Sequence, residues 1–285
     1  MTEPIIDRAE RRIDAKDFVK LTQLHLDHDW LKYEPEALFE LWCLSEDNKQ
    51  KDLIEHLIKN FSFIDSRALN EGGKGIANKI EEGWNLKPHN TFLVATCGDD
   101  KPDGSQCLIQ VLKNKFSPDW KETNFYNKIT VGANEIPNNS NIILVDDFIG
   151  TGDTMVRKID YVNSTIIKRK LKNITLSIVS LASMSFAKEV LDKLNIKYHS
   201  EHWLKKGIEE LIDEKNKESA TQSMEQMEEK LQKRYRGKRL PNFGYKRSEA
   251  LFALEAYNIP NNVFPIFWWP FYKGGNRRKT LFTRI

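Results

Sequence analysis

At residues 142–154 the chain reads IILVDDFIGTGDT, and this stretch decides the fold. Its four leading apolar residues, 142–145, are a short run without strict alternation, which predicts a strand covered on both faces of a mainly parallel sheet. Ligands of such sheets bind at the carboxyl ends of the strands. The stretch therefore predicts a binding site that opens directly after Val145.

The second half of the stretch has the composition of a phosphate site. Gly150 and Gly152 allow a tight bend and a close backbone approach, and Thr151 and Thr154 supply hydroxyl groups. A helix that starts near Asp153 would add its free N–H groups, which bind anions. We therefore expect residues 150–154 to cradle a phosphate.

The two carboxylates between these halves indicate a different ligand group. Asp146 and Asp147 would repel a phosphate that they faced, but they are acceptors suited to a vicinal diol or to the shell of a Mg²⁺ ion. A ligand that carries both a ribose diol and a phosphate satisfies the whole stretch.

The pattern on either side of this stretch is typical of an α/β fold. Short buried runs at Thr91–Thr96, Ile142–Val145, Ile174–Leu181 and Ile196–His199 predict strands. Between them, apolar residues at helical spacing predict helices over Ser105–Lys115, Met155–Ile166 and Ala187–Leu194. Alternating strands and helices indicate a mostly parallel sheet with flanking helices.

The flanking regions favour helices rather than strands. Residues 36–63 predict two helices around the polar segment SEDNKQKD, residues 205–235 a long charged helix or helix pair, and Ser248–Tyr257 a further helix. We therefore expect a helical N-terminal domain (1–88), an α/β core (89–204) and a helical, basic C-terminal extension (205–285).

Composition excludes several classes of protein. With 40% hydrophobic and 30% charged residues the chain is neither disordered nor fibrous. No apolar run approaches the roughly 18 to 20 residues of a membrane span, and the charged start MTEPIIDRAERRIDAK is unlike a signal peptide. We expect a cytoplasmic protein that does not contact membranes, with Cys43, Cys97 and Cys107 as reduced thiols.

Charge is distributed unevenly along the chain. Residues 1–60 carry nine Lys/Arg against fourteen Asp/Glu, whereas residues 233–285 carry twelve against two. The basic end could meet a nucleic acid, an acidic partner protein or the acidic N-terminus of the same chain.

The stretch 142–154 resembles, at every position, the phosphoribosyl-pyrophosphate (PRPP) motif of type I phosphoribosyltransferases. The resemblance implies a phosphoribosyltransferase-like fold that binds PRPP or a nucleotide, with glycosyltransferase activity if it is an active enzyme. It implies that Asp146 and Asp147 hold the ribose hydroxyls and contact Mg²⁺ indirectly, as the catalytic pair. It assigns the 5′-phosphate to Gly150, Thr151, Gly152, Asp153 and Thr154.

Other elements of that family match less closely. Its pyrophosphate loop would correspond to Cys97–Ser105, with Gly98, Asp99, Asp100 and Lys101 as the candidate residues. Three aspartates of this loop, Asp103 included, occupy a place meant for an anionic group. The acid that assists the base in purine-salvage members is replaced by Gly150. The mobile hood would lie within Lys113–Lys128, where its cation would be one of Lys113, Lys115, Lys121 and Lys128.

A second resemblance lies outside the core. The N-terminal helical segment, the PRPP-like stretch and the tail around Gly244-Tyr245 and Phe267-Trp268-Trp269 resemble a bacterial group of phosphoribosyltransferase-like proteins associated with conflict and anti-phage systems. This resemblance implies an effector or regulator, and with extensions of this size we expect an oligomer or a component of a complex.

Three further features have ordinary structural explanations. The segment GGKG (72–75) is read as a glycine turn before a short helix at Ile76, because the strand and the Gly-Lys-Ser/Thr order of a phosphate loop are absent. His25 and His28 form a possible metal pair but have no strong third ligand. Six of the nine residues 264–272 are aromatic and precede Arg277, Arg278 and Lys279, so they suit either core packing or nucleic-acid stacking.

Three functions remain open from the sequence. One is a Mg²⁺-dependent enzyme that acts on PRPP or a related ribose 5-phosphate compound. Another is a non-catalytic sensor of PRPP or a nucleotide. The third is an interaction module that docks on nucleic acid or a partner through its basic end.

Overall fold

The chain folds into two compact units. The computed structural model describes residues 13–98 and 103–284. One unit, here the helical unit, consists of Met1–Phe63, Gly207–Leu251 and Asn261–Ile285, and the other, the sheet unit, of Ile64–Lys206 and Phe252–Pro260. The sequence placed boundaries after residues 88 and 204, whereas each unit combines segments that are distant in the chain.

The sheet unit is built on five parallel strands in the order β3-β2-β4-β5-β6. This arrangement confirms the predicted mostly parallel α/β fold. The strands are β2 (Thr91–Ala95), β3 (Phe125–Tyr126), β4 (Asn141–Ile149), β5 (Thr175–Met184) and β6 (Lys197–Leu204). Two other short strands, β1 (Ser62–Ile64) and β9 (Phe252–Leu254), lie where the chain passes between the units.

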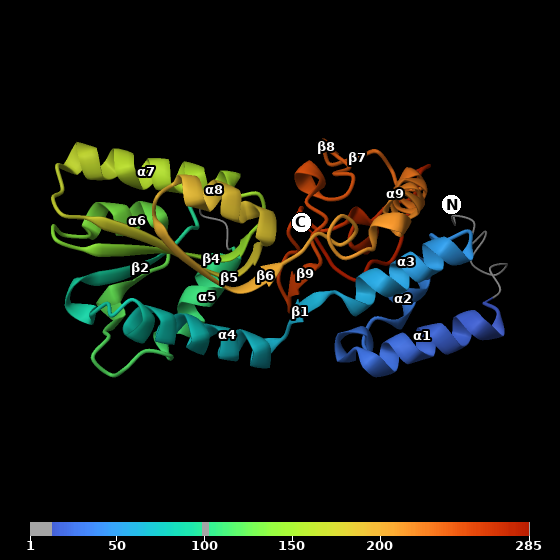
Figure 1. Cartoon of the computed structure of the whole chain (residues 1–285), viewed down its shortest axis with the longest axis horizontal. Coiled ribbons are helices and arrows are strands. Elements are labelled where there is room, and N and C mark those ends of the chain that lie inside the picture. The colour runs from blue at the N-terminus through green and yellow to red at the C-terminus, as the bar shows by residue number, and fades with distance from the viewer. Residues whose placement is uncertain (1–12, 99–102, 285) are drawn as a thin grey trace, which may run out of the picture. The chain divides into compact units, whose positions relative to one another are not determined.

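Helices cover both faces of this sheet. Figure 1 shows α4 and α5 on one face and α6, α7 and α8 on the other. Their bounds are α4 (Ser66–Asn78), α5 (Gly104–Lys113), α6 (Ile129–Glu135), α7 (Asp153–Arg169) and α8 (Lys188–Lys193), with short helical turns at η2 (Lys79–Gly83), η3 (Pro88–Asn90), η4 (Glu122–Asn124) and η5 (Ser185–Ala187).

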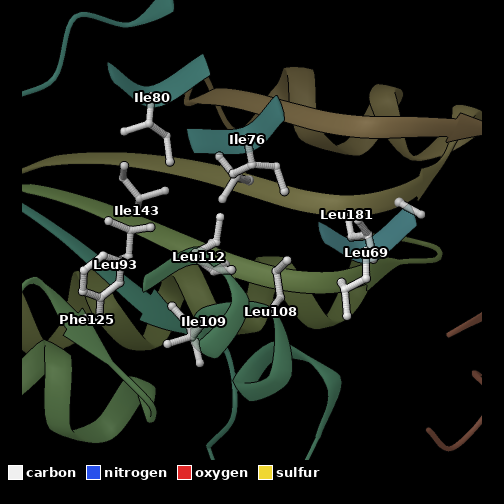
Figure 2. Packing of buried hydrophobic residues seen from close by; sticks show 14 of the residues in the cluster. Leu69, Ile76, Ile80, Leu93, Leu108, Ile109, Leu112, Phe125, Ile143 and Leu181 are labelled. Carbon is white, nitrogen blue, oxygen red and sulfur yellow. The ribbon is translucent and has the colours of Figure 1, made fainter. Parts of the chain in front are cut away.

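Alternate residues of each strand build two separate cores. Leu93 and Ile143 pack with α4 and α5, as Figure 2 shows, while Val94, Ile142 and Leu144 pack with α6, α7 and α8. All five side chains are almost fully buried. Burial on both faces explains why the strands are apolar runs without strict alternation.

The strand order contains a switch point between β2 and β4. From β2 the chain continues outward to β3, whereas from β4 it continues in the opposite direction through β5 to β6. The connections after β2 and after β4 therefore leave the sheet in different directions. In open parallel sheets this geometry creates the crevice in which ligands bind.

The glycines of segment 72–75 lie inside α4, so the expected turn is wrong. A β-carbon on Gly72 would lie 2.6 Å from the Leu181 side chain, and one on Gly73 would lie 2.8 Å from that of Val111. One on Gly75 would contact the Glu201 carboxylate. Close approach of α4 to β5, β6 and α5 thus offsets the low helix propensity of glycine.

The helical unit contains most of the remaining helices: α1 (Ala15–Asp27), η1 (Asp29–Leu31), α2 (Pro35–Trp42), α3 (Asn48–Lys59) and α9 (Glu214–Glu229). The pair α2 and α3 matches the prediction for residues 36–63. The long helix expected from residue 205 begins only at Glu214, because Glu249 accepts hydrogen bonds from the amides of Ile208 and Glu209 and holds that segment in turns.

The C-terminal segments contain fewer helices than expected. After α9 come β7 (Arg234–Tyr235), β8 (Lys238–Arg239), η6 (Tyr245–Arg247) and η7 (Pro265–Phe267). The helix expected over Ser248–Tyr257 is wrong, since strand β9 lies within it and Glu249 and Ala256 have positive φ values of 52° and 63°.

Most of the aromatic segment 264–272 is core. Phe264, Phe267, Trp268 and Trp269 are each at most 6% exposed. Packing therefore accounts for these four rings, and they do not offer stacking surfaces to a nucleic acid.

No helix in the described residues is both long and apolar enough to span a membrane.

Candidate functional site

The candidate site lies at the switch point, where β4 extends beyond β2. Pairing of β2 with β4 ends at Ala95 opposite Val145, but β4 continues beside β5 as far as Ile149, which faces Ser183. Asp146 and Asp147 are therefore part of the strand rather than its exit loop. Because β2 has already ended, Thr96 and the start of α5 lie beside these two carboxylates.

The amino end of α5 contacts Asp147 directly. A β-carbon on Gly104 would lie 2.1 Å from Oδ2 of Asp147, so only glycine leaves room for this carboxylate. The turn is fixed by Asp103, whose carboxylate accepts hydrogen bonds from the amide (3.0 Å) and the hydroxyl of Ser105. The Ser105 hydroxyl in turn accepts a hydrogen bond from the amide of Cys97 at 3.1 Å.

Asp103, Asp146 and Asp147 form a cluster of like charges. Burial, followed by the charges of Asp147 and Asp103, raises the pKa of Asp146 well above its ordinary value. Burial and the charge of Asp103 raise the pKa of Asp147 to about 6. Full ionisation of these acids is therefore unfavourable in the free protein, and a bound cation or a group that donates hydrogen bonds would favour it.

The loop after β4 has the shape of an anion cradle. Gly152 has φ of +83°, and a β-carbon there would lie 3.0 Å from the Val190 side chain, so both conformation and space require glycine. Gly152 offers no side-chain cap to α7, the amide of Asp153 donates to the Thr151 hydroxyl at 3.5 Å, and the first amides of a helix have no partner within its backbone. Thr151 donates to the Asp153 carboxylate at 2.8 Å, and Thr154 accepts from Arg157 at 3.0 Å.

The loop that follows β2, here called the first loop, is described only in part. Gly98 is described, whereas Asp99, Asp100 and Lys101 fall outside the described residues. A β-carbon on Gly98 would lie 2.5 Å from Nζ of Lys158, so this ammonium group rests against the backbone of Gly98. Lys158 thus connects α7 with the first loop.

The four lysines expected in the hood lie in different places. Lys113 is at the far end of α5 and pairs with Glu122 at 3.2 Å, and Lys115 packs beside Gly73 of α4. Lys121 precedes η4. Lys128 directly precedes Ile129, whose amide donates to the Cys97 carbonyl at 2.9 Å, so it is the one of these four beside the first loop.

A segment from the C-terminal part of the chain also reaches this region. Residues 252–260 belong to the sheet unit, and Phe252 stacks on Phe148 of β4 with ring centroids 4.8 Å apart and an interplanar angle of 14°. Tyr257 forms a hydrogen bond with Cys107 of α5, which, with burial, raises the pKa of Tyr257 to about 12.

Sequence patterns placed Gly104 in the candidate pyrophosphate loop but did not identify Lys158, Phe252 and Tyr257 as site residues. Lys158 follows Thr154 by four positions, so helical spacing alone would have placed it on the face of α7 that carries Thr154. The position of Phe252 could not be found in this way, because its contact with Phe148 is long-range.

The other candidate metal pair gains no support from its surroundings. His25 and His28 each have a buried Nε2 without a hydrogen-bond partner, and burial lowers the pKa of His28. Across residues 13–98 and 103–284 no group of three His, Cys, Asp or Glu side chains is arranged to hold a metal ion.

Comparison with known proteins gives one match over most of the chain. The model of the PRTase-CE family, in which PRTase stands for phosphoribosyltransferase, matches residues 30–284. No curated protein matches.

Several solved structures resemble part of the chain. A hypothetical protein from Neisseria gonorrhoeae with bound ppGpp is 14% identical and covers 51% of this chain and 85% of its own (TM-score 0.36). Orotate phosphoribosyltransferase from Mycobacterium tuberculosis with inorganic phosphate is 10% identical, covering 55% and 97% (TM-score 0.35). Hypoxanthine phosphoribosyltransferase from Trypanosoma cruzi with IMP is 12% identical, covering 49% and 69% (TM-score 0.33).

Proposed function

The chain belongs to the PRTase-CE family, and from this premise we propose that its sheet unit binds PRPP or a related ribose 5-phosphate nucleotide together with Mg²⁺. The observation that carries this proposal is the position of two carboxylates, Asp146 and Asp147, on the same strand end that leads into the amino end of α7. The two carboxylates that would accept hydrogen bonds from the ribose diol are therefore only a few residues from the loop, 150–154, that would bind the phosphate.

The ribose end of the ligand suits the acidic cluster. An ionised carboxylate accepts hydrogen bonds from two neighbouring hydroxyls. Gly104 leaves space beside Asp147, and Thr96 donates to Asp146 and favours its ionised form. The phosphate would then accept hydrogen bonds from the amides of residues 151–154, where the helix dipole favours an anion.

The pyrophosphate end of the ligand would lie along the first loop. The ammonium of Lys158 is already beside Gly98, and it would neutralise charge on a pyrophosphate group there. Asp99, Asp100 and Lys101 stay candidates for this loop from the sequence alone. The Lys158 position supports a diphosphate-bearing ligand over a simple sugar phosphate.

The residues present fit a Mg²⁺ ion that is shared with the ligand. Burial, followed by the charges of neighbouring acids, raises the pKa values of Asp146 and Asp147, and a divalent ion would favour their ionised forms. Since the described residues offer no three-ligand group, phosphate oxygens of the ligand would complete the shell. When bound, Mg²⁺ would polarise the pyrophosphate as a leaving group.

Two outcomes of binding are compatible with the site. In an enzyme, Asp146 and Asp147 would hold the ribose while an acceptor attacks the anomeric carbon and pyrophosphate leaves. In a sensor the ligand would bind without reacting, and Gly150 favours this second possibility because it occupies the place of the acid that assists the base. Incubation of the protein with PRPP and Mg²⁺, followed by assay for pyrophosphate, separates the two.

A regulatory role would account for the second unit. All the site residues named above belong to the sheet unit, and we propose that the protein is an effector or regulator of bacterial anti-phage defence. Phage plating on bacteria that express the wild-type chain, compared with bacteria that express Asp146→Asn/Asp147→Asn, tests this role. Equal plating on the two strains would contradict it.

Ligand affinity should rise as the pH rises through about 6. The diol needs ionised carboxylates, and the pKa of Asp147 is raised to about 6, so calorimetry at pH 5 should give an affinity for PRPP about tenfold lower than at pH 7.

The stability of the free protein should show the opposite trend. The folded pKa of Asp147 lies above the unfolded value, so this group's stabilising contribution is present at pH 4 and is lost as the pH rises through 6. Asp147→Asn should remove this loss of stability, which melting curves at pH 4 and 7 would measure.

For the binding prediction, a PRPP affinity that is the same at pH 5 and 7 would contradict the assignment of Asp147 to the ribose diol.

Replacing Gly104 with alanine should reduce binding without unfolding the protein. The new methyl group would overlap Oδ2 of Asp147, so the carboxylate must move, and we expect about a tenfold or greater loss of PRPP affinity. Alanine at the first turn of α5 should leave the melting temperature unchanged or raised.

Gly83→Ala is the matched control for this variant. A β-carbon there meets only the flexible side chain of Lys79, so binding should be unaffected. Normal affinity in Gly104→Ala would show that Asp147 does not contact the ligand.

A further inference from the structure

The helical unit carries a row of exposed cations on a short β-hairpin. Strands β7 and β8 pair antiparallel, with Arg234 opposite Arg239 and Tyr235 opposite Lys238. Arg236 and Gly237 form the tip, and both have positive φ values, 47° and 73°. We define residues 233–239 as the basic hairpin. All five of its cations are exposed: Lys233, Arg234, Arg236, Lys238 and Arg239.

Nothing in the described residues neutralises these five charges. No Asp or Glu occurs between Lys230 and Ser248 in the sequence. Nearby cations outside the hairpin do have partners, as in the pairs Lys230–Glu46 at 2.9 Å and Lys279–Glu36 at 3.8 Å. Over residues 13–98 and 103–284, none of the hairpin cations forms an ion pair.

The hairpin is attached firmly to its unit. The Tyr235 ring packs against Phe271 and Trp269, with centroids 4.9 and 6.2 Å apart. The amide of Gln232 donates to the Phe271 carbonyl at 3.0 Å. The cations are therefore displayed on a fixed ribbon, which reduces the entropy lost when they bind a partner.

A neighbouring turn adds to the same positive surface. The amide of Lys273 donates to the carbonyl of Lys230 at 2.6 Å, so residues 273–277 lie beside the base of the hairpin. Lys273 and Arg277 are exposed there. The surface thus presents seven cations, the five of the hairpin and these two.

The chemistry of this surface favours a polyphosphate over other partners. Its one aromatic ring, Tyr235, is partly buried against Phe271 and Trp269, so no apolar side chain is free to anchor a protein interface or to enter a membrane. A two-stranded ribbon has the width of the DNA major groove, and exposed Arg and Lys bind the phosphates on either side.

We propose that the basic hairpin binds the phosphate backbone of a duplex nucleic acid without sequence preference. This binding is separate from the PRPP site and involves none of its residues. The buried rings of Phe264, Phe267, Trp268 and Trp269 supply no base stacking, so the interaction is electrostatic and strongly dependent on salt.

The test compares two variants that each lose four positive charges. One is Arg234→Gln/Arg236→Gln/Lys238→Gln/Arg239→Gln. The control is Lys168→Gln/Lys172→Gln/Lys193→Gln/Lys197→Gln, in the sheet unit, where all four lysines lie on the surface. Fluorescence anisotropy with a labelled 20-base-pair DNA duplex measures binding at several salt concentrations.

We expect the wild-type chain and the control to bind the duplex, and to lose about 1,000-fold or more in affinity between 50 and 200 mM salt. The hairpin variant should bind far more weakly, with a salt slope smaller by about 3 to 4. Its PRPP titration should be unchanged. Equal loss in both variants, or wild-type binding confined to anionic lipid vesicles or to polyglutamate, would overturn the proposal.

Discussion

Replacing both site carboxylates, as Asp146→Asn/Asp147→Asn, should abolish measurable PRPP binding and at the same time stabilise the free protein. Hydrogen bonds to charged groups contribute about 1.5 to 3 kcal/mol each, so loss of two carboxylate acceptors should weaken binding by about 100-fold or more. Calorimetric titration with PRPP and Mg²⁺ measures this loss.

The gain in stability follows from the same geometry. Asp147 has its pKa raised to about 6 by burial and by Asp103, so its ionised form is unfavourable in the folded chain at pH 7. Neutral asparagines remove this repulsion, and we expect the free variant to be more stable by about 1 to 2 kcal/mol.

A matched variant separates site effects from a general change in charge. Asp119 and Asp160 are exposed acids of the same unit, and Asp119→Asn/Asp160→Asn should change neither PRPP affinity nor stability appreciably. If the site variant binds PRPP as tightly as the wild-type chain does, these carboxylates do not hold the ligand.

The second large effect concerns Gly244 in the helical unit. This residue has φ of +77°, and a β-carbon would lie 1.8 Å from the backbone carbonyl oxygen of Asn262. Gly244→Ala must therefore displace backbone, and we expect it to destabilise the helical unit by about 3 kcal/mol or more. Thermal or urea unfolding, followed by tryptophan fluorescence, measures the change.

Gly237 provides the control for this substitution. It has a similar φ of +73°, but a β-carbon at this position would have no atom within 4 Å. Gly237→Ala should cost only the conformational term, about 1 kcal/mol. If the two variants are destabilised equally, the contact of Gly244 with Asn262 is not responsible.

The sequence predicted the elements of the sheet unit well because their signals are local. Apolar runs and helical spacing placed β2, β4, β5, β6, α5 and α7 close to their observed positions. The end of β4 was less accessible to prediction. Two aspartates are not typical strand residues, and they lie in a strand because β4 continues to pair with β5 as far as Ile149.

The errors arise where distant parts of the chain override local preference. Glycines at 72, 73 and 75 favour a turn, but α4 includes them because it packs closely on β5, β6 and α5. Ser248–Tyr257 has helical spacing, yet its middle is strand β9, and Phe252 there stacks on Phe148, more than one hundred residues earlier. No periodicity carries this kind of information.

For the proposed site, the sequence predicted the two acids and the glycine-containing loop after β4 but not the residues that surround them. Asp146, Asp147 and Gly152 were identifiable because they follow a buried strand in a fixed order. The contacts of Gly104 with Asp147 and of Lys158 with Gly98 depend on how α5 and α7 approach the loops. Those approaches are tertiary, so they required the structure.

The most direct test of the ribose-phosphate site is calorimetric titration of PRPP into the wild-type chain, with and without Mg²⁺, followed by assay for released pyrophosphate. We predict saturable one-site binding that is strengthened by Mg²⁺, whether or not pyrophosphate appears. Absence of binding in the presence of Mg²⁺, from a protein that melts cooperatively, would contradict the proposed site.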